Sequence, residues 1–286
     1  MFQKISIIGL GLLGGSICRA LRRRESGADI TVYARSPEKL EKAVWDGTAD
    51  RVLPVDEIAP AGADLVIICA PVIPSVDIVV SLLSMSALES QTLIIDVGSV
   101  KRPVVDVARD HERGGRFIGC HPMTGSEKTG YEYSSEDLYR GASVIITPHE
   151  HNDPEDIEKV ERFWRDLGAK TVITTAEKHD SFVARTSHLP HLLACLLVGL
   201  ADGAEEGIED PRPFIGNGFR DMTRIAGGSP EMWADIFTAN GDNMEKALAL
   251  LGSGIAKFTG KLKSESGHGQ VKTWLQEIRA EKGKTG

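Results

Sequence analysis

Polar side chains able to move a proton follow two short apolar runs of the chain. One group is HPMTGSEKTG, which begins at His121, and the other is DVGSVK at residues 96–101, which contains Ser99. Such stretches are typical of solvated loops. Oxidation of an alcohol, however, requires a group that accepts the hydroxyl proton as hydride leaves, and the pKa range of histidine suits that task. His121 is therefore a candidate base. Ser99 either points its hydroxyl into the same site or caps a helix that starts near Val100.

A glycine-rich turn near the start of the chain predicts a nucleotide site. The stretch KISIIGLGLLGGS places Gly9, Gly11 and Gly14 behind an apolar run and ahead of a helix expected to start near Leu13. Dinucleotide binding requires this order, because glycines permit a tight turn while the helix N-terminus faces the pyrophosphate. We expect these glycines, with Leu12 and Leu13, to hold the cofactor. The alternative is a glycine turn that only packs helix against strand.

The end of the second apolar run indicates which nicotinamide cofactor fits. Asp29 lies about 20 positions past the turn, the spacing of a carboxylate that holds an NAD ribose. Asp29, however, begins the expected strand, whereas ligands of this fold lie at the carboxyl ends of strands. Ala34, Arg35 and Ser36 occupy that end, and a guanidinium with a hydroxyl can hold a 2′-phosphate. The sequence favours NADP, with NAD as the alternative if Arg35 is only a solvated loop residue.

Two other strand ends are expected to line the same crevice. The stretch CAPVIP overlaps the end of the apolar run at 65–69, and DVGSVK follows the run at 93–95. We expect Ala70, Pro71 and Val97 to lie beside the cofactor.

Short apolar runs alternate with helical stretches over the first half of the chain. The expected strands are 5–8, 30–33, 65–69, 93–95, 117–118, 144–146 and 171–173, and the expected helices are 17–24, 37–46, 76–85 and 154–167. This alternation predicts an α/β fold with a doubly wound parallel sheet covered on both faces. We place a Rossmann-type dinucleotide-binding domain at residues 1–174.

After residue 175 the spacing of apolar residues predicts helices only, at 178–205, 232–251 and 271–281. A loop at 207–230 separates the first two, and its length together with its Arg and Asp residues indicates an ordered, functional segment. We therefore place an all-α domain for substrate binding and dimerisation at 175–286. The stretch LPHLLACLLVGLADGA is too apolar for one exposed face, which predicts a homodimer through this domain.

Composition argues against several classes of partner. The 33 Lys and Arg against 41 Asp and Glu give a net charge of −8, which disfavours nucleic acid and anionic membrane surfaces and favours a small-molecule substrate. The four cysteines are scattered without a C-x-x-C pair, as in a reduced protein. We see no secretory leader and no apolar run near the ~18 residues of a membrane span, and expect a cytoplasmic location.

The pair His188 and His191 raises the alternative of a metal site, because residues three apart share a helix face. Zinc takes at least a third protein ligand, and the remaining histidines show no ligand spacing. We therefore expect no metal.

Five motifs occur in this order: GLGLLGGS, DVGSVK, HPMTGSEKTG, SHLPH and GFRDMTRIAGGSPEMW. With that order and spacing, the chain resembles the prephenate/arogenate (cyclohexadienyl) dehydrogenase family of tyrosine biosynthesis over nearly its whole length. The resemblance implies oxidative decarboxylation of prephenate, arogenate or both. A ring carbon loses hydride to the nicotinamide and the ring carboxylate leaves as CO2, so that 4-hydroxyphenylpyruvate or tyrosine is formed.

The resemblance also implies roles for single residues. His121 hydrogen-bonds the ring hydroxyl and accepts its proton, with Ser99 fixing the histidine or sharing that bond. Arg224 pairs with a substrate carboxylate through its planar fork, against the alternative of an ion pair with Asp221. Ala34 departs from the acidic residue that many relatives carry there. The residues implied to shape the substrate pocket are Ser126, Glu127, Ser187, His191, Asp221 and Trp233, the last from the same subunit or from a partner.

Two other functions remain as alternatives. A 3-hydroxyacid dehydrogenase or imine reductase also joins a dinucleotide-binding half to a helical half, but the hydroxyacid enzymes usually carry a catalytic lysine in a K-x-x-x-N pattern, which the stretch at Lys178 lacks. A protein that senses NADPH without turnover has no need of His121.

Overall fold

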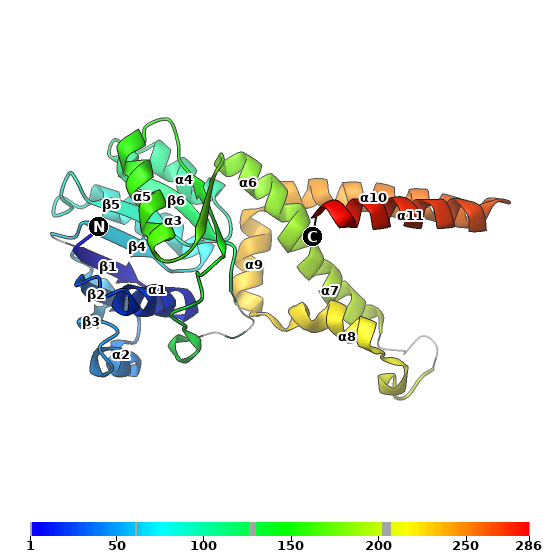
Figure 1. The fold of residues 1–286 in the computed structure, drawn as a ribbon, viewed down its shortest axis with the longest axis horizontal. Helices are drawn as coiled ribbons and strands as arrows, with labels where there is room; N and C mark the ends of the chain where they lie inside the picture. Colours follow the sequence, from blue (N-terminus) through cyan, green and yellow to red (C-terminus); the bar gives the residue numbers. More distant parts are fainter. Residues whose placement is uncertain (1, 61, 126–127, 129, 202–206, 286) are drawn as a thin grey trace. The chain divides into compact units, whose positions relative to one another are not determined.

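The chain folds as two compact units, Met1–Asn240 and Gly241–Gly286. The structure is a computed structural model that describes residues 2–60, 62–125, 128, 130–201 and 207–285. Figure 1 traces the chain from strand β1 to helix α11. The sheet and the helices that follow it as far as Asn240 belong to the first unit, while the expected boundary between 174 and 175 stays a prediction.

The first unit is built on an eight-stranded sheet in the order β3-β2-β1-β4-β5-β6-β7-β8. The strands are β1 (Lys4–Ile8), β2 (Asp29–Ala34), β3 (Arg51–Pro54), β4 (Leu65–Ile68), β5 (Leu93–Asp96), β6 (Phe117–Pro122), β7 (Ser143–Thr147) and β8 (Lys170–Ile173). The expectation of a wholly parallel sheet is wrong for one pair, because β6 and β7 are antiparallel. An antiparallel return requires no crossover helix, and the α-helices of this unit lie outside the segment between these two strands. Strand β3, an edge strand with no fully buried residue, was not expected.

The strands on which the glycine turn depends end in register at one edge of the sheet. Ile8 of β1 pairs with Tyr33 of β2 and with Ile68 of β4, and Ile68 pairs with Asp96 of β5. Because β6 runs parallel to β5, its carboxyl end, which carries His121, lies at this same edge. The backbone therefore brings the expected cofactor and proton-transfer residues to one side of the sheet.

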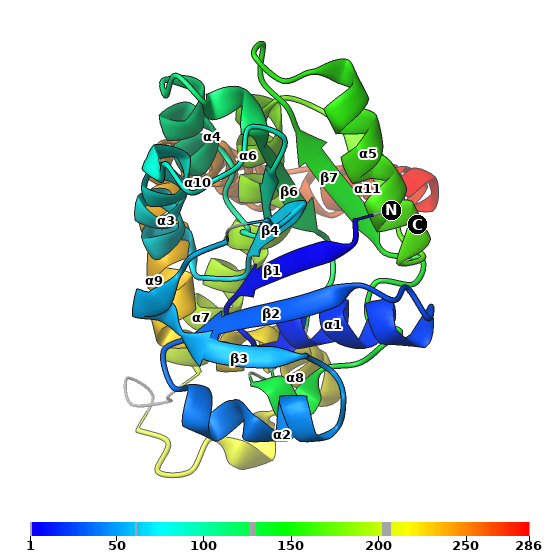
Figure 2. The same ribbon diagram turned by 90° about the vertical axis from the view of Figure 1, so that its left-hand side faces the viewer.

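Helices cover both faces of the sheet, as expected for a doubly wound fold (Figure 2). One apolar layer joins α1 (Leu12–Arg23) and α5 (Pro154–Asp166) to residues such as Ile5 and Ile7. The other joins α3 (Val72–Ser84) and α4 (Arg102–Arg109) to Val66 and Ile94. Strands buried on both faces read as continuous apolar runs, which is why the sequence located them. Helix α2 (Glu41–Trp45) follows β2.

The helical part of the first unit differs from expectation in three places. The single helix expected at 178–205 is α6 (Ala176–Val183), a π-helical turn η5 (Ala184–His188) and α7 (Leu189–Leu200). The expected loop at 207–230 contains α8 (Asn217–Thr223). The helix expected at 232–251 is divided at Asn240 into α9 (Pro230–Ala239) and α10 (Gly241–Lys263).

Short 3₁₀ turns also occur in the first unit, at η1 (Pro37–Leu40), η2 (Val55–Glu57), η3 (Gly114–Arg116), η4 (Tyr131–Tyr133), η6 (Arg212–Phe214) and η7 (Arg224–Gly227).

The second unit consists of α10 and α11 (Gly267–Thr285). Phe258 packs on Trp274 with ring centroids 5.1 Å apart, which joins the two helices. Apolar side chains on this unit, among them Leu250 and Ile255, are more than half exposed.

The segment Ala176–Leu200 is long and apolar enough to cross a membrane, judged by length and composition alone. The expectation that no segment approaches that length is therefore wrong. The segment also holds His179, Asp180 and His188, each at most 3% exposed and hydrogen-bonded within the protein. Core helices of globular proteins pass the same test of length and hydropathy. All four cysteines are free thiols.

Candidate active site

The glycine turn fits a dinucleotide phosphate. Gly9 has a positive φ of 96°, and a Cβ at this position would lie 2.5 Å from the carbonyl oxygen of Cys69. A Cβ on Gly14 would lie 2.2 Å from the Gly9 oxygen, so both positions require glycine. A Cβ on Gly11 would meet nothing within 4 Å, and no side chain caps helix α1 there. The first N–H groups of α1, beginning at Leu12 and Leu13, are thus left for an anionic ligand.

The carboxyl end of β2 carries no carboxylate. Ala34 is buried at this end, Arg35 is exposed and Ser36 is half-buried. Asp29 begins β2, at the opposite end from the glycine turn, and its carboxylate pairs with Arg51 at 2.7 Å. The geometry places Asp29 away from the ligand edge.

The ends of β4 and β5 continue this edge of the sheet. The Cys69 N–H donates to the Ile8 carbonyl at 2.8 Å, and the Val97 N–H donates to the Ile68 carbonyl at 3.1 Å. Ala70 and Pro71 follow, and the hydroxyl of Ser75 donates to both of their carbonyl oxygens. The contacts of Ala70, Pro71 and Val97 with a cofactor stay predictions.

Ser99 is not the N-cap of a helix. Helix α4 begins at Arg102, and the side chain that receives its first N–H groups is Asp180, from helix α6. The Lys101 N–H donates to Asp180 Oδ1 and the Arg102 N–H donates to Oδ2, both at 2.8 Å. The Ser99 side chain is half-buried in the turn between β5 and α4. The alternative role considered for Ser99 is therefore wrong.

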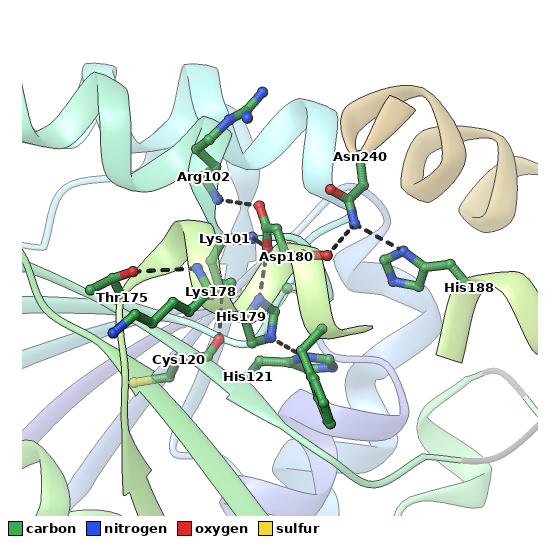
Figure 3. Close-up of polar contacts among 12 residues, drawn as sticks. Lys101, Arg102, Cys120, His121, Thr175, Lys178, His179, Asp180, His188 and Asn240 are labelled. Carbon is green, nitrogen blue, oxygen red and sulfur yellow. Dashed lines mark hydrogen bonds and ion pairs between the residues drawn. The ribbon is translucent and has the colours of Figure 1, made fainter. Parts of the chain in front are cut away.

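His121 is one end of a buried chain of hydrogen bonds (Figure 3). Its Nδ1 lies 2.8 Å from Nε2 of His179, and Nδ1 of His179 lies 2.7 Å from Oδ1 of Asp180. The two rings meet edge to face, with centroids 5.0 Å apart. His121 is 8% exposed, while His179 and Asp180 are more deeply buried.

The backbone beside His121 is held by a buried ion pair between Asp96 and Lys101. Both charged side chains are at most 1% exposed. Lys101 Nζ donates to the Cys120 carbonyl at 2.9 Å, and the Cys120 N–H donates to Asp96 Oδ1 at 3.0 Å. The Gly98 N–H donates to the other carboxylate oxygen of Asp96 and shapes the turn that carries Ser99. A buried charge is stable only when it is paired and hydrogen-bonded, as this one is.

Burial determines the charge of the His121 ring. Desolvation lowers the pKa of His121 well below its ordinary value of 6.5, and the nearby His179, Lys101 and His188 lower it further. A neutral imidazole has one ring nitrogen free to accept a proton. The site therefore holds an imidazole that is uncharged at neutral pH and able to accept a proton.

Helices α7 and α9 form an aromatic wall in the first unit. The His191 ring stacks on Trp233 with centroids 3.5 Å apart and planes 11° apart. A Cβ on Gly228 would lie 2.6 Å from Nε1 of Trp233, so glycine leaves the space for this stack. Trp233 packs with buried Val72 and Val100, at the amino end of α3 and in the turn after β5. The stack of Trp233 is made within one chain.

The other expected substrate residues are distributed over this helical part. Ser187 is half-buried on η5, Asp221 is exposed on α8, and Arg224 is exposed at the start of η7, which contacts α7. Among the described residues there is no ion pair between Arg224 and Asp221. Ser126 and Glu127 lie outside the described residues. The placement of Arg224 and His121 in one substrate site stays a prediction.

Three buried polar residues at this site were missed by the sequence reasoning. His179 and Asp180 complete the chain behind His121, and Asn240 donates to the Asp180 carbonyl at 2.9 Å and faces Nδ1 of His188 at 3.2 Å. The one available signal was a His–Asp pair on a helix next to SHLPH. For the residues that the structure describes, no group of three potential metal ligands is found.

Comparison with known proteins matches both parts of the chain to one family. Residues 17–173 match the family description "Prephenate dehydrogenase, nucleotide-binding domain", and residues 175–277 match "Prephenate dehydrogenase, dimerization domain". The cyclohexadienyl dehydrogenase of Zymomonas mobilis is 31% identical over 268 residues, which is 93% of this chain and 91% of the relative.

Solved structures agree over the full length. Prephenate dehydrogenase from A. aeolicus, in complex with hydroxyphenyl propionate and NAD+, has a TM-score of 0.88 and 30% identity, and the alignment covers 100% of this chain and 99% of that one. The Synechocystis arogenate dehydrogenase has a TM-score of 0.81 and 27% identity, covering 99% of this chain and 100% of that one.

Proposed function

The chain belongs to the prephenate dehydrogenase family, and from that premise we propose that it oxidatively decarboxylates prephenate, arogenate or both with an NAD(P) cofactor. The observation that carries the proposal is a buried, neutral histidine at the same sheet edge as a glycine turn shaped for a dinucleotide. The nicotinamide ring, when bound, accepts hydride from the substrate ring. All other steps are assigned to side chains of this protein.

His121 is the base of the proposed reaction. Its imidazole accepts the proton of the substrate hydroxyl, and the Ser99 hydroxyl shares that hydrogen bond. A positioned general base contributes about 10²- to 10⁴-fold to a rate. Release of CO2 and aromatisation of the ring drive the reaction forward. The protein therefore mainly orients the substrate, which is worth up to about 7–11 kcal/mol of the barrier.

Arg224 is the proposed partner of a substrate carboxylate. A planar guanidinium binds a carboxylate through two parallel hydrogen bonds and so fixes its orientation. The stack of His191 on Trp233 provides a flat wall for the ring, which supports placing both in the substrate pocket. The remaining residues proposed to line this pocket are Ser126, Glu127, Ser187 and Asp221.

The preferred cofactor is proposed to be NADP, with NAD as the alternative. The glycines of the turn with Leu12 and Leu13 bind the pyrophosphate, and Ala70, Pro71 and Val97 lie beside the nicotinamide half. Arg35 and Ser36 hold the 2′-phosphate. Support comes from the exposed guanidinium of Arg35 and from the position of Asp29 at the far end of β2.

The protein is further proposed to act as a cytoplasmic homodimer with its Rossmann-type domain at 1–174 and its helical domain at 175–286. The family description names the second part a dimerization domain, which supports this assembly. Nucleic acid and membranes are not proposed as partners, in line with the net charge of −8.

A direct assay tests the proposed function. Purified protein is incubated with prephenate or arogenate and with NADP or NAD, while reduced nicotinamide is followed by absorbance and CO2 is measured. The proposal predicts that at least one of the two substrates yields reduced nicotinamide and CO2 in equal amounts. It also predicts a higher kcat/KM for NADP than for NAD. Cofactor binding without turnover of either substrate would refute the enzymatic assignment, and a higher kcat/KM for NAD would refute the cofactor preference.

A further inference from the structure

The hydrogen-bond chain behind His121 has a definite direction. Both carboxylate oxygens of Asp180 already accept backbone N–H groups, from Lys101 and Arg102. The carboxylate is therefore the acceptor in its contact with His179, and Nδ1 of His179 carries a hydrogen. The donors come from the first turn of α4, so the carboxylate also lies where the helix dipole favours negative charge.

The direction continues to His121. We take His179 as a neutral imidazole, and hydrogen on its Nδ1 then leaves Nε2 as its acceptor. Nε2 of His179 lies 2.8 Å from Nδ1 of His121, so with this tautomer of His179 the His121 Nδ1 is the donor in the contact. The lone pair of His121 is then on Nε2, the nitrogen on the other side of the ring.

We propose that His179 and Asp180 are positioning residues that hold His121 in the tautomer with hydrogen on Nδ1 and a free Nε2. The inference rests on the proposed function, in which His121 is the base. The substrate hydroxyl proton moves to Nε2, and the resulting imidazolium keeps its Nδ1–H bond to His179. His179 and Asp180 do not touch the substrate, and they act through the orientation of the His121 ring.

The charged and titratable groups around this chain come from three elements. Lys101 and Asp96 approach from β5 and the turn before α4, Asp180 and His179 lie on α6, and His188 ends the π turn. Lys101 is paired with Asp96. Among the residues described here, the Asp180 carboxylate is thus the one negative group in direct contact with a histidine of the hydrogen-bond chain.

Substitution of His179 tests the proposal without disturbing the N-terminus of α4, because Asp180 remains in place. His179→Leu removes the acceptor for the His121 Nδ1–H. His179→Gln returns an amide oxygen near the position of Nε2. We expect kcat to fall roughly 10- to 10⁴-fold in His179→Leu with KM within about threefold, a range that extends from losing the partner of a metal-bound histidine to losing the residue that sets the tautomer of a catalytic histidine. His179→Gln should recover part of the loss, and exposed His151→Leu is the matched control.

A spectroscopic readout separates this inference from the proposed function. A long-range proton–nitrogen correlation spectrum of protein with isotopically labelled histidine distinguishes protonated from bare ring nitrogens, and His121→Asn assigns the His121 signals. We expect hydrogen on Nδ1 of His121 in the native protein and a mixture of tautomers in His179→Leu. Hydrogen on Nε2 in the native protein, or an unchanged pattern in His179→Leu, would overturn the inference. If His121 is not the base, the His121→Asn variant would instead retain normal turnover.

Discussion

The His121 ring lies at the carboxyl edge of the sheet, where desolvation lowers its pKa and keeps the imidazole neutral. The proposed role of His121 as the base leads to a direct prediction. His121→Asn keeps a polar group of similar size but removes the proton acceptor. We expect kcat to fall by about 10²- to 10⁴-fold while KM stays within a few-fold, measured by steady-state kinetics. Near-normal turnover by this variant would show that another group takes the proton.

Substitution of Arg224 should affect mainly substrate binding, because its proposed role is to pair with a substrate carboxylate. A hydrogen bond to a charged group contributes about 1.5–3 kcal/mol, which corresponds to roughly 10- to 100-fold in affinity. Arg224→Ala should therefore raise KM by about that factor with a smaller change in kcat. Arg212→Ala, which removes an exposed guanidinium paired with Asp210, is the control. An unchanged KM would remove Arg224 from the substrate site.

At this scale the sequence located residues that stand in recognisable local motifs. His121 and His191 could be proposed from the sequence because each lies in a short polar motif next to an apolar stretch. The partner of His121 was not found, because His179 lies 58 positions later in the chain. Such contacts depend on how α6 docks beside β6, which local spacing does not report.

The π turn η5 is the element that aligns the buried polar residues of α6 and α7. In a regular α-helix, residues eight apart are about 80° apart around the axis. A π turn absorbs about one extra residue, which reduces the separation of Asp180 and His188 to about 20°. Asn240 then reaches both the Asp180 carbonyl and the His188 ring. No residue type marks this turn, so periodicity predicted an uninterrupted helix.

Burial of His188 predicts a loss of stability in acid. Desolvation lowers the pKa of His188 from its ordinary value of 6.5 to about 4. Between these values the unfolded chain binds a proton that the folded protein does not, so the free energy of unfolding falls as pH falls. The contribution of His188 to the free energy of unfolding is fully present above about pH 6.5. It decreases by about 1.4 kcal/mol per pH unit between about pH 6.5 and pH 4.

The measurement is urea unfolding from pH 7 to pH 4.5 for the native protein and for His188→Asn. The variant should show a smaller decrease in the free energy of unfolding over this range, and the exposed His268→Asn serves as the control. The remaining pH dependence includes His121, whose pKa is shifted in the same direction. An equal decrease in the native protein and His188→Asn would contradict a neutral, buried His188.

The elements of the sheet domain were largely predictable because five of the seven expected apolar runs carry buried residues on both faces. The exceptions have physical reasons. Strand β3 lies at the edge with exposed or half-buried residues, and the direction of β7 depends on the path of the chain after His121 rather than on its own residues. The helix α8 was read as loop because Gly216, just before it, and Gly218, in its first turn, disfavour helix.

At the scale of the whole molecule, exposed apolar side chains favour association. In the first unit Leu196, Val198 and Leu200 of α7 are about half exposed or more, and in the second unit Leu250 and Ile255 of α10 are too. Apolar surface of this kind is typical of a protein interface. Light scattering at micromolar concentration should give twice the mass of one chain, and Leu196→Glu or Ile255→Glu should lower that mass. A monomeric native protein would contradict the homodimer.

The fold class and the family were predictable at this scale because several different motifs occur along the chain in the order that the family shows. The division of the chain at Asn240 was not, since the sequence shows a change of pattern near residue 175 and none at 240. Compactness depends on contacts across the whole unit, and these include the packing of α9 on α3.

The central claim is that His121 and Arg224 hold opposite ends of one substrate beside the nicotinamide. A crystal structure of the protein with NADP and 4-hydroxyphenylpyruvate tests this claim most directly. We predict Nε2 of His121 within about 2.6–3.2 Å of the product hydroxyl, and the Arg224 guanidinium on the product carboxylate. A product whose hydroxyl contacts neither His121 nor Ser99, or whose carboxylate lies away from Arg224, would contradict the account.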